Sequence, residues 1–459
     1  MAATLCAAEV PAGNAAPFEN LYREAYERRI RESGPEHPDT VSSLVRLAAL
    51  MRSHGRAEAA EPLLRQALGA QTAGASADTM VELAETLAVL GRHSEADGFY
   101  QRSLELAEAG ERSAGTLIRV ARLRNAGGDP LGAEQAYRKA LQHFEMGGPL
   151  SRDGRRVRAA ALNDLGLLLE AEGELAAAET AYRESADSHA DAYGARHPAT
   201  AAVRANLAST LAVRGEAADA AALLEQSIGV IRAAYGPRHD DVARLQNRLG
   251  EVYEVLGRLD EAQARYLAAL AVWDGPSPSR GMALTDLGRL AGVRGDFDAA
   301  ETVLAEAVGH LQTAGEAMAV ELAEALDSYG SVLRGSGRLD EAEPLLRRAL
   351  VIRETKLGAS HPDVALSLVG LAGVFHLRGN LARAGTLYDR ALDIQERTLG
   401  PDHPEVGETL YNLAHVRRSL GETVSAADAL ERAAEILSAA YGADDPFVAE
   451  VLSALRALR

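Results

Sequence analysis

The sequence predicts an all-α protein: a right-handed superhelical solenoid of about ten helical hairpins, with half-repeat caps at both ends. Three observations support this fold class. Ala and Leu, which favour helices, supply much of the apolar composition, whereas aromatic residues make up only 4% of the 459 residues. No sustained alternation of Val, Ile and Thr indicates strands. A set of small residues recurs along nearly the whole chain with a period close to 42 residues.

The repeat is marked by ten glycines, each of which precedes an alanine by five residues. Successive glycines are separated by 36, 37, 45, 42, 42, 38, 42, 42 and 42 residues. Seven places before each glycine stands Ala or Gly, and twelve places after it stands Ala or Ser. The glycines are Gly55, Gly91, Gly128, Gly173, Gly215, Gly257, Gly295, Gly337, Gly379 and Gly421.

The spacing within each repeat predicts two helices joined at the glycine. Positions five, nine and twelve after the glycine fall on one face of an α-helix. Each repeat is therefore predicted as helix A, a turn where the glycine adopts a positive φ, and helix B. The small residues mark close helix contacts. Gly166, Gly250, Gly288 and Gly330 each cost about 1 kcal/mol within helix A relative to Ala, so close packing has to compensate.

The two ends of the chain indicate caps. Residues 18–31 are predicted as a lone B helix and residues 446–459 as a lone A helix, whose apolar side chains could also mediate self-association. Residues 1–16 are expected to form a disordered tail, followed by the solenoid over 17–459. A lengthened connection near 147–156 indicates a possible subdivision, a small basic contact site or a solvated loop.

The pattern resembles the tetratricopeptide repeat, in the longer 42-residue form of kinesin light chains. A clear copy begins at Lys356: KLGASHPDVALSLVGLAGVFHLRGNLARAGTLYDRALDIQERTLGPDHPEV. The large aromatic residue of the family's helix A is absent: Leu162, Leu284, Leu368 and Leu410 stand there, and two repeats hold Arg204 and Gln246, which predicts looser packing. The resemblance implies a concave groove, lined by A helices, that binds extended or helical segments of other proteins.

Candidate binding residues occupy the groove positions, defined as the places three, six, nine and ten residues before each turn glycine. Asn206 and Asn412 match the family's asparagine at place nine, which grips the ligand backbone; Asn163 and Asn247 stand one place earlier. An amide both donates and accepts hydrogen bonds, as such a grip requires. A solvated polar face is the alternative. The predicted peptide-binding residues are Asn163, Asn206, Asn247, Arg248, Asn412, His415, Arg418, Arg119 and Arg122.

Arg119 and Arg122 form the most basic local pair, one helical turn apart. They could bind a carboxylate or an acidic segment through bidentate hydrogen bonds. Ion pairs with neighbouring repeats, at Glu82 or Glu85, are the equal alternative.

Composition excludes several classes of function. The net charge of −18 argues against a nucleic-acid partner, because phosphate binding needs a basic surface. A single cysteine, Cys6, excludes an intrachain disulfide and a cysteine-ligated zinc site. No run of 18 apolar residues predicts a membrane span, and the first residues do not resemble a signal peptide, so we expect a cytoplasmic protein without membrane attachment.

Five histidines recur in the turns before helix A, at His37, His197, His239, His361 and His403. Zinc needs several ligands within about 2 Å of one ion. Successive hairpins are offset by about 20 Å, twice the diameter of a helix, so these histidines cannot share a metal. We interpret the motif as a structural turn, in which Gly ends helix B and Pro begins helix A.

No motif for nucleotide binding, metalloprotease or serine-hydrolase chemistry occurs, and no cofactor is expected. The sequence therefore predicts a non-catalytic scaffold or adaptor for a protein or peptide ligand. The first alternative is a regulatory sensor whose superhelix changes shape when a peptide binds, with a hinge near Gly147. An enzyme that uses the groove as its active site is a third, weaker hypothesis.

Overall fold

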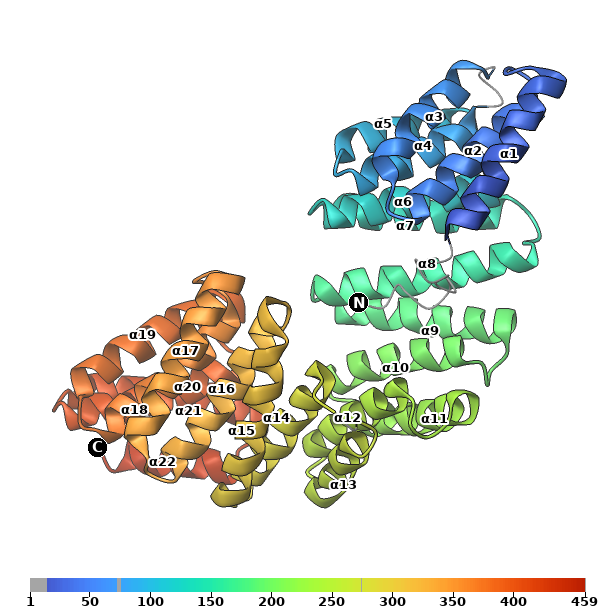
Figure 1. Ribbon diagram of the computed structural model, residues 1–459. Coiled ribbons are helices and arrows are strands. Elements are labelled where there is room, and N and C mark those ends of the chain that lie inside the picture. Colours follow the sequence, from blue (N-terminus) through green and yellow to red (C-terminus); the bar gives the residue numbers. More distant parts are fainter. Residues whose placement is uncertain (1–14, 72–75, 274, 459) are drawn as a thin grey trace. The chain divides into compact units, whose positions relative to one another are not determined.

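The computed structural model describes residues 15–71, 76–273 and 275–458 (Figure 1). The regular elements of these residues are helices, and none of the residues described is in a strand, which confirms the all-α prediction. Contacts between Cα atoms divide the chain into two compact units, Met1–Leu223 and Leu224–Arg459. Helix α11 (Ala217–Tyr235) contains the boundary. Most of the expected N-terminal tail, with Cys6, lies outside the described residues; α1 begins at Ala15.

The first unit is a succession of antiparallel helices. Its elements before α11 are α1 (Ala15–Ser33), α2 (Pro38–Ser53), α3 (Ala57–Gly69), α4 (Ala77–Val89), α5 (His93–Glu105), α6 (Glu111–Ala126), α7 (Pro130–Met146), α8 (Arg152–Ala171), α9 (Leu175–Tyr193) and α10 (Pro198–Val213).

The second unit continues the same order. Its elements after α11 are α12 (Asp240–Val255), α13 (Leu259–Leu270), α14 (Pro278–Val293), α15 (Phe297–Thr313), the short 3-10 helix η3 (Gly315–Met318), α16 (Ala319–Gly335), α17 (Leu339–Leu357), α18 (Pro362–Leu377), α19 (Leu381–Thr398), α20 (Pro404–Ser419), α21 (Thr423–Tyr441) and α22 (Pro446–Arg456).

The turn glycines join the two helices of each repeat as the sequence predicts. All ten have positive φ values, between 69° and 86°. Such values are strained for residues that carry a Cβ, which explains why glycine recurs at this place. Four hairpins, from α2–α3 to α8–α9, lie within the first unit, and five, from α12–α13 to α20–α21, lie within the second.

The small residues allow helices A and B of one hairpin to touch. The alanine five places after each turn glycine is buried, and so is the Ala or Ser twelve places after it. Ala342 and Ala349 illustrate the two positions, with no exposed surface. A Cβ on Gly330 would lie 2.6 Å from Cγ of Leu346, which comes from the partner helix. Real atoms do not approach so closely, so the missing side chain of Gly330 is the space that Leu346 fills.

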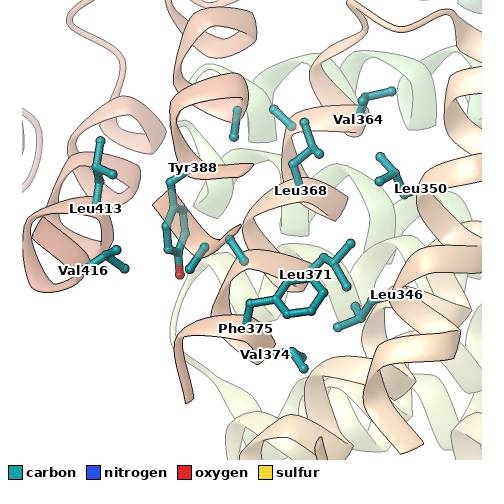
Figure 2. Close-up of a cluster of buried hydrophobic side chains, with 14 of the residues drawn as sticks. Leu346, Leu350, Val364, Leu368, Leu371, Val374, Phe375, Tyr388, Leu413 and Val416 are labelled. Atoms are coloured by element: carbon teal, nitrogen blue, oxygen red, sulfur yellow. The ribbon is translucent and has the colours of Figure 1, made fainter. Parts of the chain in front are cut away.

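Helices of successive hairpins share one apolar core. Figure 2 shows part of this core in the second unit: Leu346 and Leu350 of α17, Phe375 of α18, Tyr388 of α19 and Leu413 of α20 come together with their neighbours. Each hairpin thus buries its apolar faces against the next, as expected for a stack in which contacts are between neighbours.

Differences in helix length account for the irregular spacings. The B helices α3 and α5, in the two shortest intervals, have 13 residues each, whereas α9 has 19. In the 45-residue interval, helix A itself is longer: α8 has 20 residues and begins at Arg152. The lengthened connection expected over 147–156 is therefore shorter than predicted and covers 147–151. The Ser151 hydroxyl caps α8 by accepting from the Gly154 N–H (2.9 Å), and donates to Glu111 (2.6 Å).

The repeats with a polar residue in helix A satisfy it locally. Gln246 is buried and accepts a hydrogen bond from Arg265 (3.4 Å), and Arg204 donates to the carbonyl oxygen of Ala195 (3.0 Å). At the end of the chain, Val448, Val451 and Leu455 of α22 are buried in a cluster with α21. Most of the apolar surface of α22 therefore caps its own unit; self-association through it stays a prediction.

Candidate interaction groove

The groove positions of the first unit carry ion pairs between successive A helices. Arg119 of α6 donates to Glu85 of α4, and Arg52 of α2 pairs with Glu82 (3.0 Å). Arg122 makes two hydrogen bonds to Oδ2 of Asp164 in α8 (2.7 and 2.9 Å). Of the two alternatives for the arginine pair, the structure contains the ion pairs with neighbouring repeats.

Arg119 and Arg122 also line a cavity of about 430 Å³. Its other lining residues include Ile118 and Phe144 from the apolar side and Asp153 from the start of α8. A ligand with an acidic group entering this cavity would have to compete with Glu85 and Asp164 for the two guanidinium groups.

Asn163 and Asn206 lie next to each other on α8 and α10. Nδ2 of Asn206 donates to Oδ1 of Asn163 at 3.0 Å, and both side chains are half-buried. Within the described part of the chain, Nδ2 of Asn163 and Oδ1 of Asn206 have no hydrogen-bond partner. The Asn163 amide nitrogen and the Asn206 amide oxygen therefore remain as a donor and an acceptor, which is the complement of a peptide unit.

Asn247 and Asp286 are the buried members of a polar network in the second unit that extends to the exposed Glu251. It donates to Asp286 of α14 (2.8 Å) and to Glu251 (2.9 Å), and it is only 9% exposed. Arg289 completes the network through two hydrogen bonds to Glu254 (2.7 and 2.9 Å). Unlike Asn206, Asn247 thus uses both amide hydrogens within the protein.

Burial, together with the neighbouring Asp286 carboxylate, raises the pKa of Glu251 to about 7. Burial likewise raises the pKa of Asp286 itself. Arg248, one residue after Asn247, is exposed, and no side-chain hydrogen bond or ion pair links it to the residues described.

Asn412, His415 and Arg418 lie along α20. Nη2 of Arg418 is 3.3 Å from Nδ1 of His415, and the His415 ring meets the Tyr411 ring edge-on at 4.6 Å. Burial, with a contribution from Arg418, lowers the pKa of His415. Asn412 is half-buried and makes no side-chain hydrogen bond within the described ranges. The structure thus brings together Asn163 with Asn206, His415 with Arg418, and Arg119 with Arg122 at one cavity. Asn247 and Arg248 share α12, and Asn412 shares α20 with His415 and Arg418.

Sequence reasoning did not identify the larger cavity, of about 720 Å³, between α14, α16 and α18. None of the predicted binding residues lines it. The available signal was a set of glycines at groove positions, Gly292, Gly370 and Gly373, flanking Arg334 and Ser328 of the intervening helix.

The recurring turn histidines cap helices. Nδ1 of His361 accepts a hydrogen bond from the backbone N–H of Asp363 (3.2 Å). In the other four turns, Nδ1 accepts from the backbone N–H two residues after the histidine (3.1–3.3 Å), at His37, His197, His239 and His403. Sequence reasoning recognised the structural turn but missed the histidine as its cap. Within residues 15–71, 76–273 and 275–458, no group of three or more His, Cys, Asp or Glu could hold a metal ion. No helix in that same part of the chain has both the length and the apolar character to cross a membrane.

Repeated helix–turn–helix units with a shared core and polar groove positions define an α-solenoid repeat protein. The family model described as Tetratricopeptide repeat matches residues 18–73, 157–233, 204–274, 241–312, 321–384 and 364–439, which together cover more than half of the chain. The chain belongs to the tetratricopeptide repeat family. The hairpins α4–α5 and α6–α7 lie between the matched segments and show the same helix order.

Two solved structures illustrate the similarity. BtubC (BKLC) from P. vanneervenii is 21% identical, with 53% of this chain and 91% of that chain covered and a TM-score of 0.41. A tetratricopeptide repeat protein from Parabacteroides merdae is 17% identical, with 62% of this chain and 93% of that chain covered and a TM-score of 0.45. No curated protein matches the chain.

Proposed function

We propose that this protein is a non-catalytic interaction scaffold or adaptor, whose groove positions bind a peptide or a segment of another protein. Membership of the tetratricopeptide repeat family supports a general role in protein–protein interaction. The observation that carries the finer proposal is the cavity of about 720 Å³ at the groove positions of α14, α16 and α18, which polar and apolar side chains line together.

The first unit offers a second point of support. The unused donor of Asn163 and the unused acceptor of Asn206 could pair with the carbonyl oxygen and N–H of a ligand backbone. Backbone recognition of this kind binds extended segments regardless of their side chains, and specificity would then come from the charged groove residues. The expected cytoplasmic location stays a prediction.

The proposal is tested by affinity capture at moderate salt, followed by measurement of the purified partner's affinity. Asn412→Ala with Arg418→Ala, and Asn163→Ala with Asn206→Ala, are each expected to weaken binding. Gln312→Ala with Arg348→Ala is the control for the first pair, because both residues are exposed on B helices and the same chemical groups are removed. Equal affinities for groove and control variants would contradict a binding site in the groove.

The regulatory alternative predicts a change in the dimensions of the protein when the complex forms. A sensor must change its dimensions when its peptide binds, whereas a scaffold need not. Small-angle scattering of the full chain with and without the captured partner separates the two; unchanged dimensions would exclude the sensor.

A further inference from the structure

Among the residues that the structure describes, Arg334 of α16 is a groove arginine without an acidic partner. It stands three residues before the turn glycine Gly337, the place that Glu254 occupies in an earlier repeat, where Glu254 is paired with Arg289 (2.7 Å). No side-chain hydrogen bond or ion pair joins Arg334 to any residue that the structure describes. Its Nε is shielded from solvent and also lacks a partner there. Arg248 is exposed and can be hydrated, whereas Arg334 is half-buried, so its shielded Nε needs an explanation.

The helices beside Arg334 carry glycine where other repeats carry charged side chains. Gly292 of α14 and Gly373 of α18 occupy groove positions that hold Glu254 and Glu251 in the repeat of α12. A Cβ on Gly373 would lie 3.1 Å from Nη1 of Arg334, so the guanidinium lies against bare backbone. Gly292 lines the cavity of about 720 Å³, and because neither glycine carries a carboxylate, neither can pair with Arg334.

The opposite end of this cavity carries an unpaired carboxylate. Glu324 lies on the same face of α16, ten residues before Arg334, which corresponds to about 15 Å along a helix. Glu324 is exposed and makes no hydrogen bond or ion pair within the described residues.

The other charged groups of the wall are already matched. Asp327 is paired with Arg353 and accepts from Ser367 (2.7 Å), and Arg289 is paired with Glu254. Asp363 is the exception, a further lining carboxylate near Glu324; the uncharged lining residues include Ser331, Leu366 and Val369. The cavity is therefore polarised within the described residues: the unpaired Glu324 carboxylate lies towards one end, the unpaired Arg334 guanidinium towards the other, and the charges of Asp327, Arg353 and Arg289 are paired.

We propose that this cavity binds an extended peptide segment that presents a basic side chain to Glu324 and a carboxylate to Arg334. An extended chain advances about 3.3 Å per residue, so the two ligand charges should stand four or five residues apart. The guanidinium offers a forked pair of donors, which suits a carboxylate from a side chain or from a C-terminus. This inference rests on the proposed function and names the class of ligand for one part of the groove.

The test uses the full chain and four pools of fluorescent hexapeptides with acetylated and amidated ends. Two pools carry Arg at one end and Glu at the other, one pool for each direction, with Leu, Val and Ser at the four inner places. The other two pools replace Glu or Arg by Gln in the direction that binds better. We expect the doubly charged pool to bind at least about tenfold more tightly than either neutralised pool, as charge-assisted hydrogen bonds imply.

Variants assign each preference to its residue. Arg334→Gln should abolish the preference for Glu over Gln while the preference for Arg persists, and Glu324→Gln should do the reverse. Gly373→Glu should also abolish the preference for Glu, because it supplies Arg334 with an internal carboxylate. Gly309→Glu is the matched control, because a Cβ there meets no atom within 4 Å, and it should bind like the unchanged protein.

Pools that bind equally well regardless of charge would overturn the inference, as would an Arg334→Gln protein that still prefers Glu. A hexapeptide with uncharged side chains and a free C-terminus is compared with its C-terminal amide. This comparison shows whether a terminal carboxylate binds as well as a side-chain carboxylate. Partner capture with the Asn163–Asn206 and Asn412–Arg418 variants tests the proposed function at other sites. A failure at Arg334 with success there overturns only the inference made here.

Discussion

Gly250 in α12 lies directly beneath the ring of Tyr266 in α13, and a Cβ on Gly250 would lie 2.5 Å from Cε1 of that ring. The same relationship joins Gly166 to Tyr182, where the distance would be 2.6 Å. In both hairpins the glycine stands seven places before the turn and the tyrosine nine places after it. The glycine is therefore retained in mid-helix because an aromatic ring occupies the space of its side chain.

Gly250→Ala should destabilise the protein despite alanine's better helix propensity. Overpacking costs about 1–3 kcal/mol and the propensity gain returns up to about 1 kcal/mol, so we expect a net loss of about 1–2 kcal/mol in the free energy of unfolding. Gly309→Ala, in the exposed part of α15 where a Cβ meets no atom within 4 Å, should instead stabilise by about 0.5–1 kcal/mol. Urea denaturation measures both. A stabilising Gly250→Ala would contradict the close contact.

His361→Ala should cost about 1 kcal/mol of stability, because the first turn of α18 loses its N-cap acceptor. His361→Asp should cost much less. Asp445 caps α22 in the equivalent turn, where its Oδ1 accepts from the N–H of Phe447 (2.8 Å). Thermal denaturation near neutral pH compares the two variants. If they were equally destabilised, the capping role of the histidine would be wrong.

Arg353→Leu should be among the more damaging single changes. Arg353 is 5% exposed, pairs with Asp327, and donates to Ser367 (2.8 Å) and to the carbonyl oxygen of Asp363 (3.1 Å). Removing it leaves the Asp327 carboxylate without its cation, at an expected cost of about 3–5 kcal/mol. Adding Asp327→Asn should recover part of that loss. A double-mutant cycle from urea denaturation measures the coupling, and strictly additive costs would show that the pair does not interact.

Glu251 should make stability depend on pH. Its pKa is about 7 in the folded protein against an ordinary value of 4.5, so the folded state holds a proton in this range that the unfolded state has lost. The resulting stabilisation is present below about pH 4.5 and disappears as the pH rises through 7. Glu251→Gln cannot ionise, and its melting temperature should exceed that of the unchanged protein at pH 8.

The advantage of Glu251→Gln should shrink as the pH falls towards 5, in a series of melting curves. Glu435→Gln, at an exposed place in α21, is the matched control for the chemical change alone. An advantage that is the same at pH 5 and pH 8 would contradict the raised pKa.

The repeat pattern predicted the fold because glycine is needed wherever φ is positive and small residues are needed wherever helices touch. Both requirements act within one hairpin, so they appear as fixed spacings. Helix lengths were harder to predict, since nothing in the repeat pattern distinguishes a longer connection from an extra turn of helix. For example, α8 begins at Arg152 because Ser151 and Glu111 fix its first turn.

The groove was only partly predictable because its side chains are matched across repeats. Asn206 and Asn247 look alike in the sequence, yet Asn247 is committed to Asp286, which lies 39 residues further along the chain. The cavity of about 720 Å³ was missed for a different reason. Gly292 and Gly370 line it at groove positions, and the prediction considered polar side chains that could bind a ligand rather than positions without a side chain.

Gly330 and Arg334 are four residues apart on α16, yet they differ in role: Gly330 leaves room for Leu346 within the hairpin, whereas Arg334 lines the cavity. Different residues of the same helix therefore determine the stability of the hairpin and the selectivity of the cavity. Substitutions at cavity-lining positions can therefore change selectivity in one hairpin after another and leave the packing between helices intact.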